Sequence, residues 1–336
     1  MRTLLPVLTA LSLVAATLQG CGPDEEAPPL HSGGVEGSRA AEPPRGELLS
    51  GTALSVEERV FAFVGDRSAS DDAALAVSWI FETRVHDGGE VRGRSLRIGS
   101  DDEWEPAVLD ADTLPRTPVP GRILPGHRIR LLSSPEGAIE ALQLRGSEGE
   151  PQLGVGIPLA QWTVPGLGAV RFHRGRMYRG DSIGEGFLLD LTRSARGDAP
   201  EPGGWIFVHG GNEFQLALSE LPLPAGAPSP PEDRSRSHYR GWGRVAVIEL
   251  QWDRIAGEWS DLRASERARR DIPMAWTFST PDERVRGHLE VTSSELVVGE
   301  GDGPLLPVEA HSVVRGHFIV EEDSFAVTGI ALHRRR

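Results

Sequence analysis

An acid and a histidine stand at positions where either could move a proton. Asp190 lies in an alternating segment, in which it shares one face with Leu188 and Thr192. If that face points into an apolar interior, desolvation favours the protonated carboxyl, which could act as a general acid. His209 follows a short aromatic run beside a Gly-Gly turn, where it could relay a proton or bind a polar group. The alternatives are a structural ion pair of Asp190, with Arg193 or another Arg, and an exposed hairpin histidine.

Tryptophans and one phenylalanine form a second set of candidates. The chain has eight Trp although aromatic residues are only 6% of it. Trp205, Phe207, Trp259 and Trp276 could line a pocket for an elongated apolar ligand, because flat rings supply contact area at little entropic cost. The same residues could instead fill a core.

Composition removes several chemistries. All 35 basic residues are Arg, so a Schiff base, a phosphate-loop lysine and a Ser–Lys dyad are excluded. The net charge of −14 argues against nucleic acid as a partner. The histidines show no metal-ligand spacing, and no Gly-rich nucleotide loop stands between a strand and a helix. We therefore expect neither a metal nor a cofactor.

The N-terminal region is expected to contain a targeting signal followed by a tether. Residues 1–20 carry an early positive charge, a short apolar run and small residues, as secretory signal peptides do. The stretch Leu18–Cys21 resembles the lipobox of bacterial lipoproteins, and this resemblance implies a diacylglycerol thioether on Cys21. Gly22, in place of Asp, implies the outer membrane of the cell envelope. Residues 21–50 are rich in Pro, Gly, Glu and Ala, which predicts a disordered tether.

Beyond residue 50 the apolar residues recur with a period of two. Examples are the segments 77–82, 187–192, 246–252 and 285–291. Such alternation is typical of half-buried antiparallel strands. Turn signals such as Asp87–Gly89 separate the segments. The sequence therefore predicts an all-β protein.

The second half contains landmarks in a definite order. They are a strand that starts Gly-aromatic and ends in Asp, a Gly-Trp strand, a Trp-Ser turn, a Pro-x-x-Trp strand and a final strand with Gly, here Gly186–Asp190, Gly204–Trp205, Trp259–Ser260, Pro273–Trp276 and Val327–Ala331. Over residues 165–332 this order resembles the double-lipocalin family. That family includes hydroxyneurosporene synthase (carotenoid 1,2-hydratase), kievitone-hydratase-like proteins and AttH-like proteins.

The resemblance implies two lipocalin-like antiparallel barrels or half-barrels in tandem, expected at residues 51–183 and 184–336. Where the family strand continues into a His-Glu-Trp-Gly-like run, this chain has Leu191–Ser194. For this reason the first expectation is a lipoprotein that binds or handles an apolar small molecule, such as a lipid, isoprenoid or carotenoid-like compound. The second is a hydratase or lyase that adds water to an isoprenoid-type alkene, with Asp190 as general acid and His209 assisting. A structural or surface-interaction lipoprotein is the third.

Overall fold

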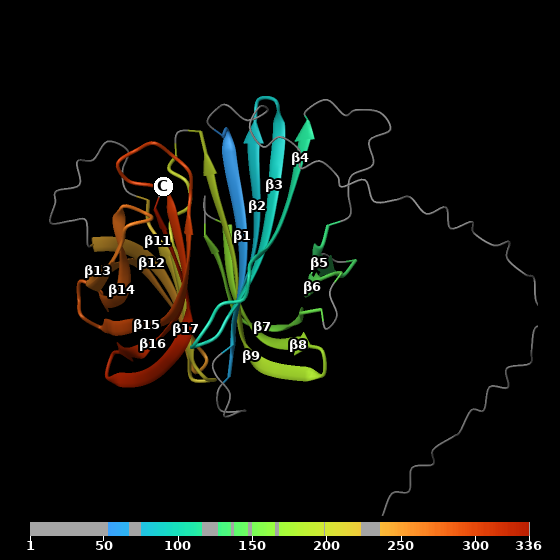
Figure 1. The fold of residues 1–336 in the computed structure, drawn as a ribbon. Coiled ribbons are helices and arrows are strands. Elements are labelled where there is room, and N and C mark those ends of the chain that lie inside the picture. The colour runs from blue at the N-terminus through green and yellow to red at the C-terminus, as the bar shows by residue number, and fades with distance from the viewer. Residues whose placement is uncertain are drawn as a thin grey trace, which may run out of the picture. The chain divides into compact units, whose positions relative to one another are not determined.

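The computed structural model describes residues 53–66, 75–115, 127–135, 138–146, 150–164, 168–197, 199–222 and 236–335. The expected signal peptide, Cys21 and the tether lie outside these residues. The described residues all belong to one compact unit, and this part of the chain is all-β, as predicted (Figure 1). In that part, no helix is long and apolar enough to cross a membrane.

The first sheet has nine antiparallel strands in the order β4-β3-β2-β1-β9-β8-β7-β6-β5. They are β1 (Ser55–Gly65), β2 (Ala76–His86), β3 (Gly89–Gly99), β4 (Val108–Pro115), β5 (Ile129–Ser133), β6 (Ile139–Leu144), β7 (Gln152–Val164), β8 (Gly168–Arg179) and β9 (Ser182–Arg196). The sheet curves most of the way into a barrel, but β4 and β5 are not paired with each other.

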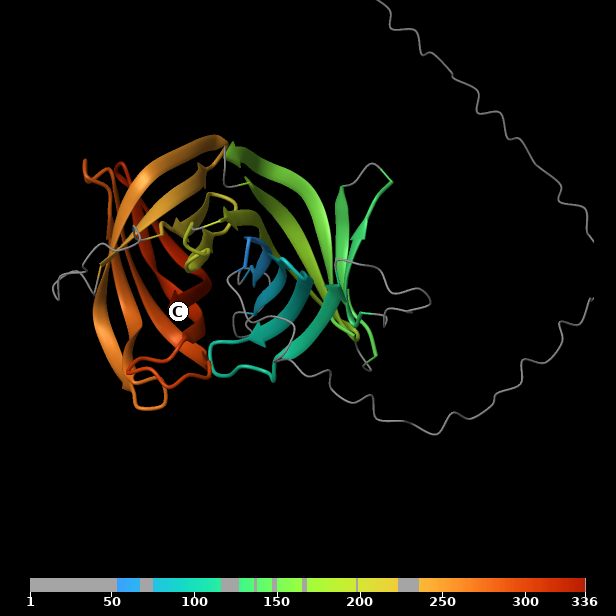
Figure 2. The same ribbon diagram turned by 90° about the horizontal axis from the view of Figure 1, so that it is seen from above.

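The second sheet is a closed barrel of eight antiparallel strands, β10 to β17. They are β10 (Trp205–Gly210), β11 (Phe214–Glu220), β12 (Arg236–Val245), β13 (Ile248–Ser265), β14 (Arg270–Ser279), β15 (Val285–Val298), β16 (Val308–Val320) and β17 (Asp323–Arg335). Pairing of β10 with both β11 and β17 closes the ring, which Figure 2 shows beside the open curve of the first sheet. The prediction of two tandem lipocalin-like barrels or half-barrels is confirmed.

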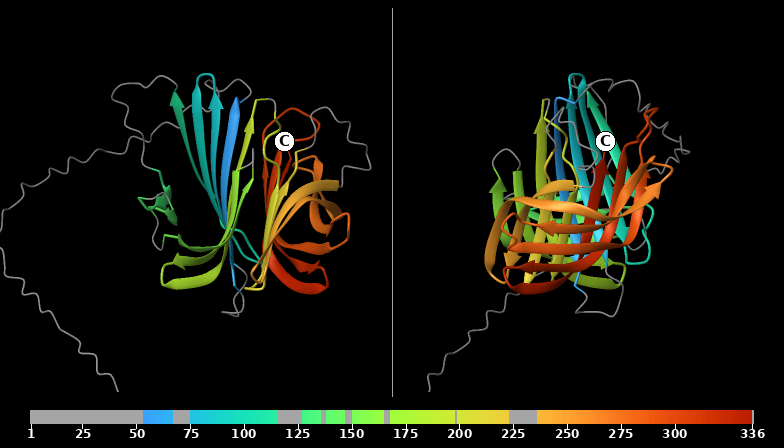
Figure 3. Two further views of the ribbon diagram at one scale, coloured as in Figure 1. Left: turned by 180° about the vertical axis from the view of Figure 1, so that it is seen from behind. Right: turned by 90° about the vertical axis from the view of Figure 1, so that its left-hand side faces the viewer.

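The two sheets meet along a shared apolar layer that includes β1, β9, β10 and β17 (Figure 3). Phe187, Leu189 and Leu191 on β9 belong to this layer, while Leu188 packs inside the first sheet. The expectation of a half-buried strand at 187–192 is therefore wrong. Sequence alternation cannot show that a second sheet covers the other face.

Large side chains that lie over glycines occupy the interior of the closed barrel. A Cβ at Gly241 would lie 2.6 Å from Ile255, and one at Gly243 would lie 2.7 Å from the Trp252 ring. At Gly287 an added Cβ would collide with the ring of a phenylalanine on β16. Glycine backbone in these strands thus makes the room that the large side chains occupy.

Two local expectations need correction. Residues 246–252 do not form one strand, because Ala246 lies in a turn with φ of 52° and β13 begins at Ile248. Strand β9 pairs with β1 and β8, so the chain changes sheets between Arg196 and Trp205, later than the expected 183/184 border.

Candidate functional site

The inner face of the first sheet brings Asp190 together with arginine side chains. On β9, Asp190 is the cross-strand neighbour of Phe61 on β1 and of Arg171 on β8. Directly opposed residues of antiparallel strands place their side chains on the same face. Leu188, two residues before Asp190, packs in the interior cluster together with Phe61. The Asp190 carboxylate therefore faces the interior of the first sheet.

Both carboxylate oxygens of Asp190 accept hydrogen bonds from guanidinium groups. Arg59 donates from Nε to Oδ1 at 2.9 Å and from Nη2 to Oδ2 at 2.7 Å. Arg171 donates from Nη1 to Oδ2 at 3.1 Å. The Asp190 side chain is 3% exposed, whereas those of Arg59 and Arg171 are 28% and 29% exposed. This arrangement suits an ionised carboxylate that orients two cations better than it suits a proton donor.

His173, two residues after Arg171 on β8, is a buried neighbour of this cluster. Its Nδ1 donates to the carbonyl oxygen of Gly156 at 2.9 Å, which leaves Nε2 as the unprotonated acceptor of a neutral ring. Among the described residues this buried Nε2 has no hydrogen-bond partner. Burial lowers the pKa of His173, although the carbonyl of Gly156 and the charge of Asp190 oppose this. The ring is therefore a neutral acceptor.

Part of the inner face is accessible and aromatic. Phe81 on β2 is the cross-strand neighbour of Arg59, and it is half-buried. Its ring meets the Phe61 ring edge-on, with 6.0 Å between the centroids. The guanidinium carbon of Arg59 lies 4.8 Å from the Phe61 centroid. Glu57, the preceding inner-face residue of β1, is exposed. Guanidinium groups and aromatic surface thus lie side by side and in reach of solvent.

Side chains rather than a strand ladder bridge the two edges of the first sheet. His127, just before β5, places Nε2 at 2.7 Å from Oδ2 of Asp112 on β4. The Arg128 amide donates to Oδ2 of Asp110 at 2.9 Å. No backbone hydrogen bond links β4 and β5 among the residues described. We call this junction, between Asp110 and Asp112 on β4 and residues His127 and Arg128, the seam of the first sheet.

His209 lies between the two sheets and is buried. Its ring centroid is 4.6 Å from that of Phe187 on β9, and its Nδ1 accepts a hydrogen bond from the Gly211 amide at 3.2 Å. Burial lowers the pKa of His209 to about 4, so the ring is neutral at pH 7. His209 is on the opposite side of β9 from Asp190. The structure does not bring the two candidate catalytic residues together.

Two of the aromatic ligand-binding candidates lie in the layer between the sheets. Trp205 and Phe207 on β10 are fully buried in that layer. The Phe207 ring centroid is 5.7 Å from that of Phe172 on β8. These rings pack against other side chains of the layer between the two sheets. They therefore contribute to the contact between the sheets and do not line a pocket.

The other two candidates belong to the closed barrel. Trp276 is buried in the cluster that fills its interior. Trp259 is half-buried, packs edge-on against His333 at 5.0 Å between centroids, and lies 5.0 Å from the guanidinium carbon of Arg335. The four aromatic candidates therefore fall into two separate clusters.

A buried ion network crosses between the sheets. Glu58 on β1 pairs with Arg193 on β9 and accepts a hydrogen bond from Nη1 of Arg334 on β17 at 2.6 Å. Nε of Arg334 lies 2.7 Å from a carboxylate oxygen of Glu309 on β16. Burial alone would raise the pKa of Glu58, but Arg193 and Arg334 bring it down to about 2. Arg193, considered above as a partner of Asp190, points to the other face of β9.

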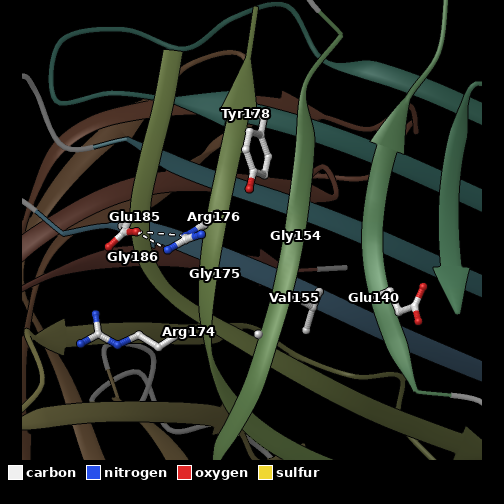
Figure 4. A pocket seen from close by; sticks show the side chains of 10 residues that line it. Glu140, Gly154, Val155, Arg174, Gly175, Arg176, Tyr178, Glu185 and Gly186 are labelled. Carbon is white, nitrogen blue, oxygen red and sulfur yellow. Dashed lines mark hydrogen bonds and ion pairs between the residues drawn. The ribbon is translucent and has the colours of Figure 1, made fainter. Parts of the chain in front are cut away.

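Two surface grooves lie elsewhere. One, of about 460 Å³, runs over glycine backbone on β7 to β9, where Arg176 pairs with Glu185 beside Tyr178 (Figure 4). The other, of about 570 Å³, lies where β14 and β15 separate. Neither groove is lined by Asp190 or Trp205. In the described part of the chain, no group of three or more His, Cys, Asp or Glu side chains could hold a metal ion.

Sequence reasoning did not single out Arg59, Arg171 and His173. A local signal exists, since Arg59 stands two residues before Phe61, and Arg171 two residues before His173, in alternating segments. Their shared carboxylate depends on the strand order β1-β9-β8. The pairing of β1 with β9 brings Arg59 to a carboxylate 131 positions away, so local patterns could not supply it.

Comparison with known proteins shows which solved structures have a similar fold. No protein-family model and no curated protein matches the sequence. Among solved structures, kievitone hydratase from Nectria haematococca aligns with a TM-score of 0.51 and 9% identity, over 84% of this chain and 89% of that one. An AttH-like protein from Nitrosomonas europaea aligns with a TM-score of 0.54 and 9% identity, over 85% and 98%. At such identity the likeness concerns architecture alone: this chain has the tandem-barrel fold of those two proteins.

Proposed function

We propose that this protein binds an apolar small molecule, such as a lipid or an isoprenoid, on the inner face of its first sheet. The observation that carries the proposal is a half-buried region on the inner face of the first sheet. Buried apolar clusters occupy both interiors, but in the first sheet Phe81, Arg59 and Arg171 lie beside the cluster and remain partly exposed. Partly exposed aromatic surface on a concave sheet suits an apolar ligand.

The unpaired edges of the first sheet, β4 and β5, support the proposal. A ligand can enter a closed barrel only through its open ends, because every strand is paired on both sides. The first sheet has no ladder between β4 and β5, and its edges are joined by contacts such as His127 with Asp112. A few side-chain contacts are easier to separate than a continuous ladder of backbone hydrogen bonds. The sheet can therefore widen at low cost.

Titration with farnesol, an isoprenoid alcohol, tests the proposal. The full chain carrying Cys21→Ser is followed by intrinsic Trp fluorescence, and we expect saturable binding of one farnesol per chain. Phe81→Asp should weaken binding about tenfold or more, because a charge replaces apolar contact area. Tyr178→Asp is the matched control, since Tyr178 is also half-buried but lines the groove on the other face. Absence of saturation, or equal losses in both variants, contradicts the proposal.

Hydration of an isoprenoid-type alkene is a second candidate, favoured by the position of Asp190. Its carboxylate lies on the proposed binding face, with neutral His173 two residues beyond Arg171 on the adjacent strand. As a general acid, Asp190 would first have to take up a proton and give up its hydrogen bonds from Arg59. Asp190→Asn should then abolish alcohol formation from an isoprenoid alkene and leave ligand binding intact. Binding without turnover in the unaltered chain excludes this candidate.

We also propose that a lipid on Cys21 holds the protein at the outer membrane. The support is the lipobox-like stretch that ends at Cys21. Cys21→Ser should move the protein from the membrane fraction to the soluble fraction after cell lysis. Persistence of the variant in the membrane fraction contradicts the proposal.

A further inference from the structure

The cluster around Asp190 carries more positive than negative charge. Two guanidinium groups, those of Arg59 and Arg171, share the single Asp190 carboxylate. His173 adds no charge, because burial lowers its pKa and its ring is neutral at pH 7. The three charged side chains sum to one positive charge. This charge lies inside the concave face proposed to bind a ligand.

Both arginines retain donors for another acceptor. A guanidinium has five N–H donors, and Arg171 uses only Nη1 in the hydrogen bonds of the described residues. Arg59 uses Nε and Nη2 for Asp190, which leaves Nη1. Each side chain is more than a quarter exposed. The pair can therefore hold an incoming anion without giving up Asp190.

The other acidic groups on this face do not compete for Arg171. Its cross-strand neighbours are Gln161 on β7 and Asp190 on β9. On β4, Asp112 is engaged with His127 and Asp110 with the Arg128 amide. On β3, Glu90 pairs with Arg92, and Glu57 on β1 is the cross-strand neighbour of Thr83 and Ser194. Arg171 thus has one carboxylate neighbour along the sheet, and that carboxylate is shared with Arg59.

Apolar surface adjoins these donors. The guanidinium carbon of Arg59 is 4.8 Å from the Phe61 centroid, and half-buried Phe81 is its cross-strand neighbour. A ligand that fits both features has a monoanionic head and an apolar body. A planar carboxylate suits the forked geometry of a guanidinium. A dianionic phosphate monoester would exceed the single positive charge of the cluster.

From these contacts we infer that the ligand of the first sheet is an amphiphilic carboxylate whose head group is bound by Arg59 and Arg171. The inference rests on the proposed function, because it names the ligand class of the same face. It adds that the head group, and not the apolar body alone, determines which molecules bind.

A comparison of three twelve-carbon ligands tests the inference. Isothermal titration of the full chain carrying Cys21→Ser uses dodecanoate, dodecanol and dodecyl phosphate, each below its micelle concentration or solubility limit. We expect dodecanoate to bind about tenfold or more tightly than dodecanol, equivalent to ~1.4 kcal/mol. Dodecyl phosphate should bind no more tightly than dodecanoate.

Two arginine variants on β8 test whether Arg171 is responsible for the preference for dodecanoate. Arg171→Gln should remove most of the preference for dodecanoate over dodecanol and leave the affinity for dodecanol within about twofold. Arg176→Gln is the matched control, because Arg176 is also on β8 but pairs with Glu185 on the opposite face. This control should keep the full preference. Thermal melting of both variants verifies that they are folded.

Each contrary result has a distinct meaning. Equal affinities for dodecanoate and dodecanol overturn the inference and leave apolar binding intact. A preference for dodecanoate that survives Arg171→Gln overturns the assigned head-group site. Failure of all three ligands and of farnesol to bind overturns the proposed function itself, and the inference with it.

Discussion

The two sheets of this protein share antiparallel topology but have different interiors. In the closed barrel, glycines such as Gly243 and Gly257 give space to rings, and the described core is apolar and filled. In the first sheet, part of the interior holds the Arg59–Asp190–Arg171 cluster. Burying a guanidinium away from water is costly unless its charge is fully matched. An interior with excess positive charge therefore favours an open sheet, whereas an apolar one favours closure.

The largest expected loss of stability comes from removing a buried ring from the closed barrel. Trp276→Ala should lower the free energy of unfolding by about 3–5 kcal/mol, because it leaves a cavity among buried rings. Phe81→Ala in the open sheet should cost less than half as much, because Phe81 is already partly exposed. Urea unfolding monitored by circular dichroism measures both. Equal costs would mean that the interior at Phe81 is as tightly packed as the closed barrel.

The next largest effect should come from the network between the sheets. Glu58→Gln leaves Arg193 and Arg334 buried with less counter-charge, which should cost about 3 kcal/mol. Glu57→Gln, one residue away on the inner face of the first sheet, is the control. Because Glu57 is exposed, this change should cost less than ~0.5 kcal/mol. Chemical unfolding of both variants distinguishes these values. Similar costs would show that the network does not join the sheets energetically.

The sequence pattern predicted the strands, and the face on which Asp190 lies, better than it predicted which side chains contact Asp190. Alternation correctly placed Asp190 on one face with Leu188, because side-chain direction along a strand is a local property. Its arginine partners depend on which strands adjoin β9, which is a nonlocal property. Alternation also missed that Phe187 and Leu188 would both be buried, on opposite faces. Only packing between two sheets produces that result.

The third prediction concerns pH and the layer between the sheets. Burial lowers the pKa of His209 to about 4 from an ordinary 6.5, so the unfolded chain binds its proton more readily. His209 therefore lowers stability as the pH falls from about 6.5 to about 4, by ~2–3 kcal/mol at most. In His209→Phe the free energy of unfolding should change less across this window. Urea unfolding at pH 7 and pH 4.5 measures the difference. An unchanged slope in the variant would assign the loss to other groups.

The smallest loss of stability should come from a change at Asp190. This prediction compares the two faces of the β1–β9 strand pair. Asp190→Asn leaves Arg59 and Arg171 without their counter-charge, but both side chains reach water. Because solvent screens and hydrates them, the expected cost is only about 1 kcal/mol. Glu58→Gln removes a carboxylate from the same pair of strands, but on the fully buried side. Urea unfolding of Asp190→Asn beside Glu58→Gln measures the difference. A cost as large as that of Glu58→Gln would mean that the inner face is closed to water, and then no ligand could reach it.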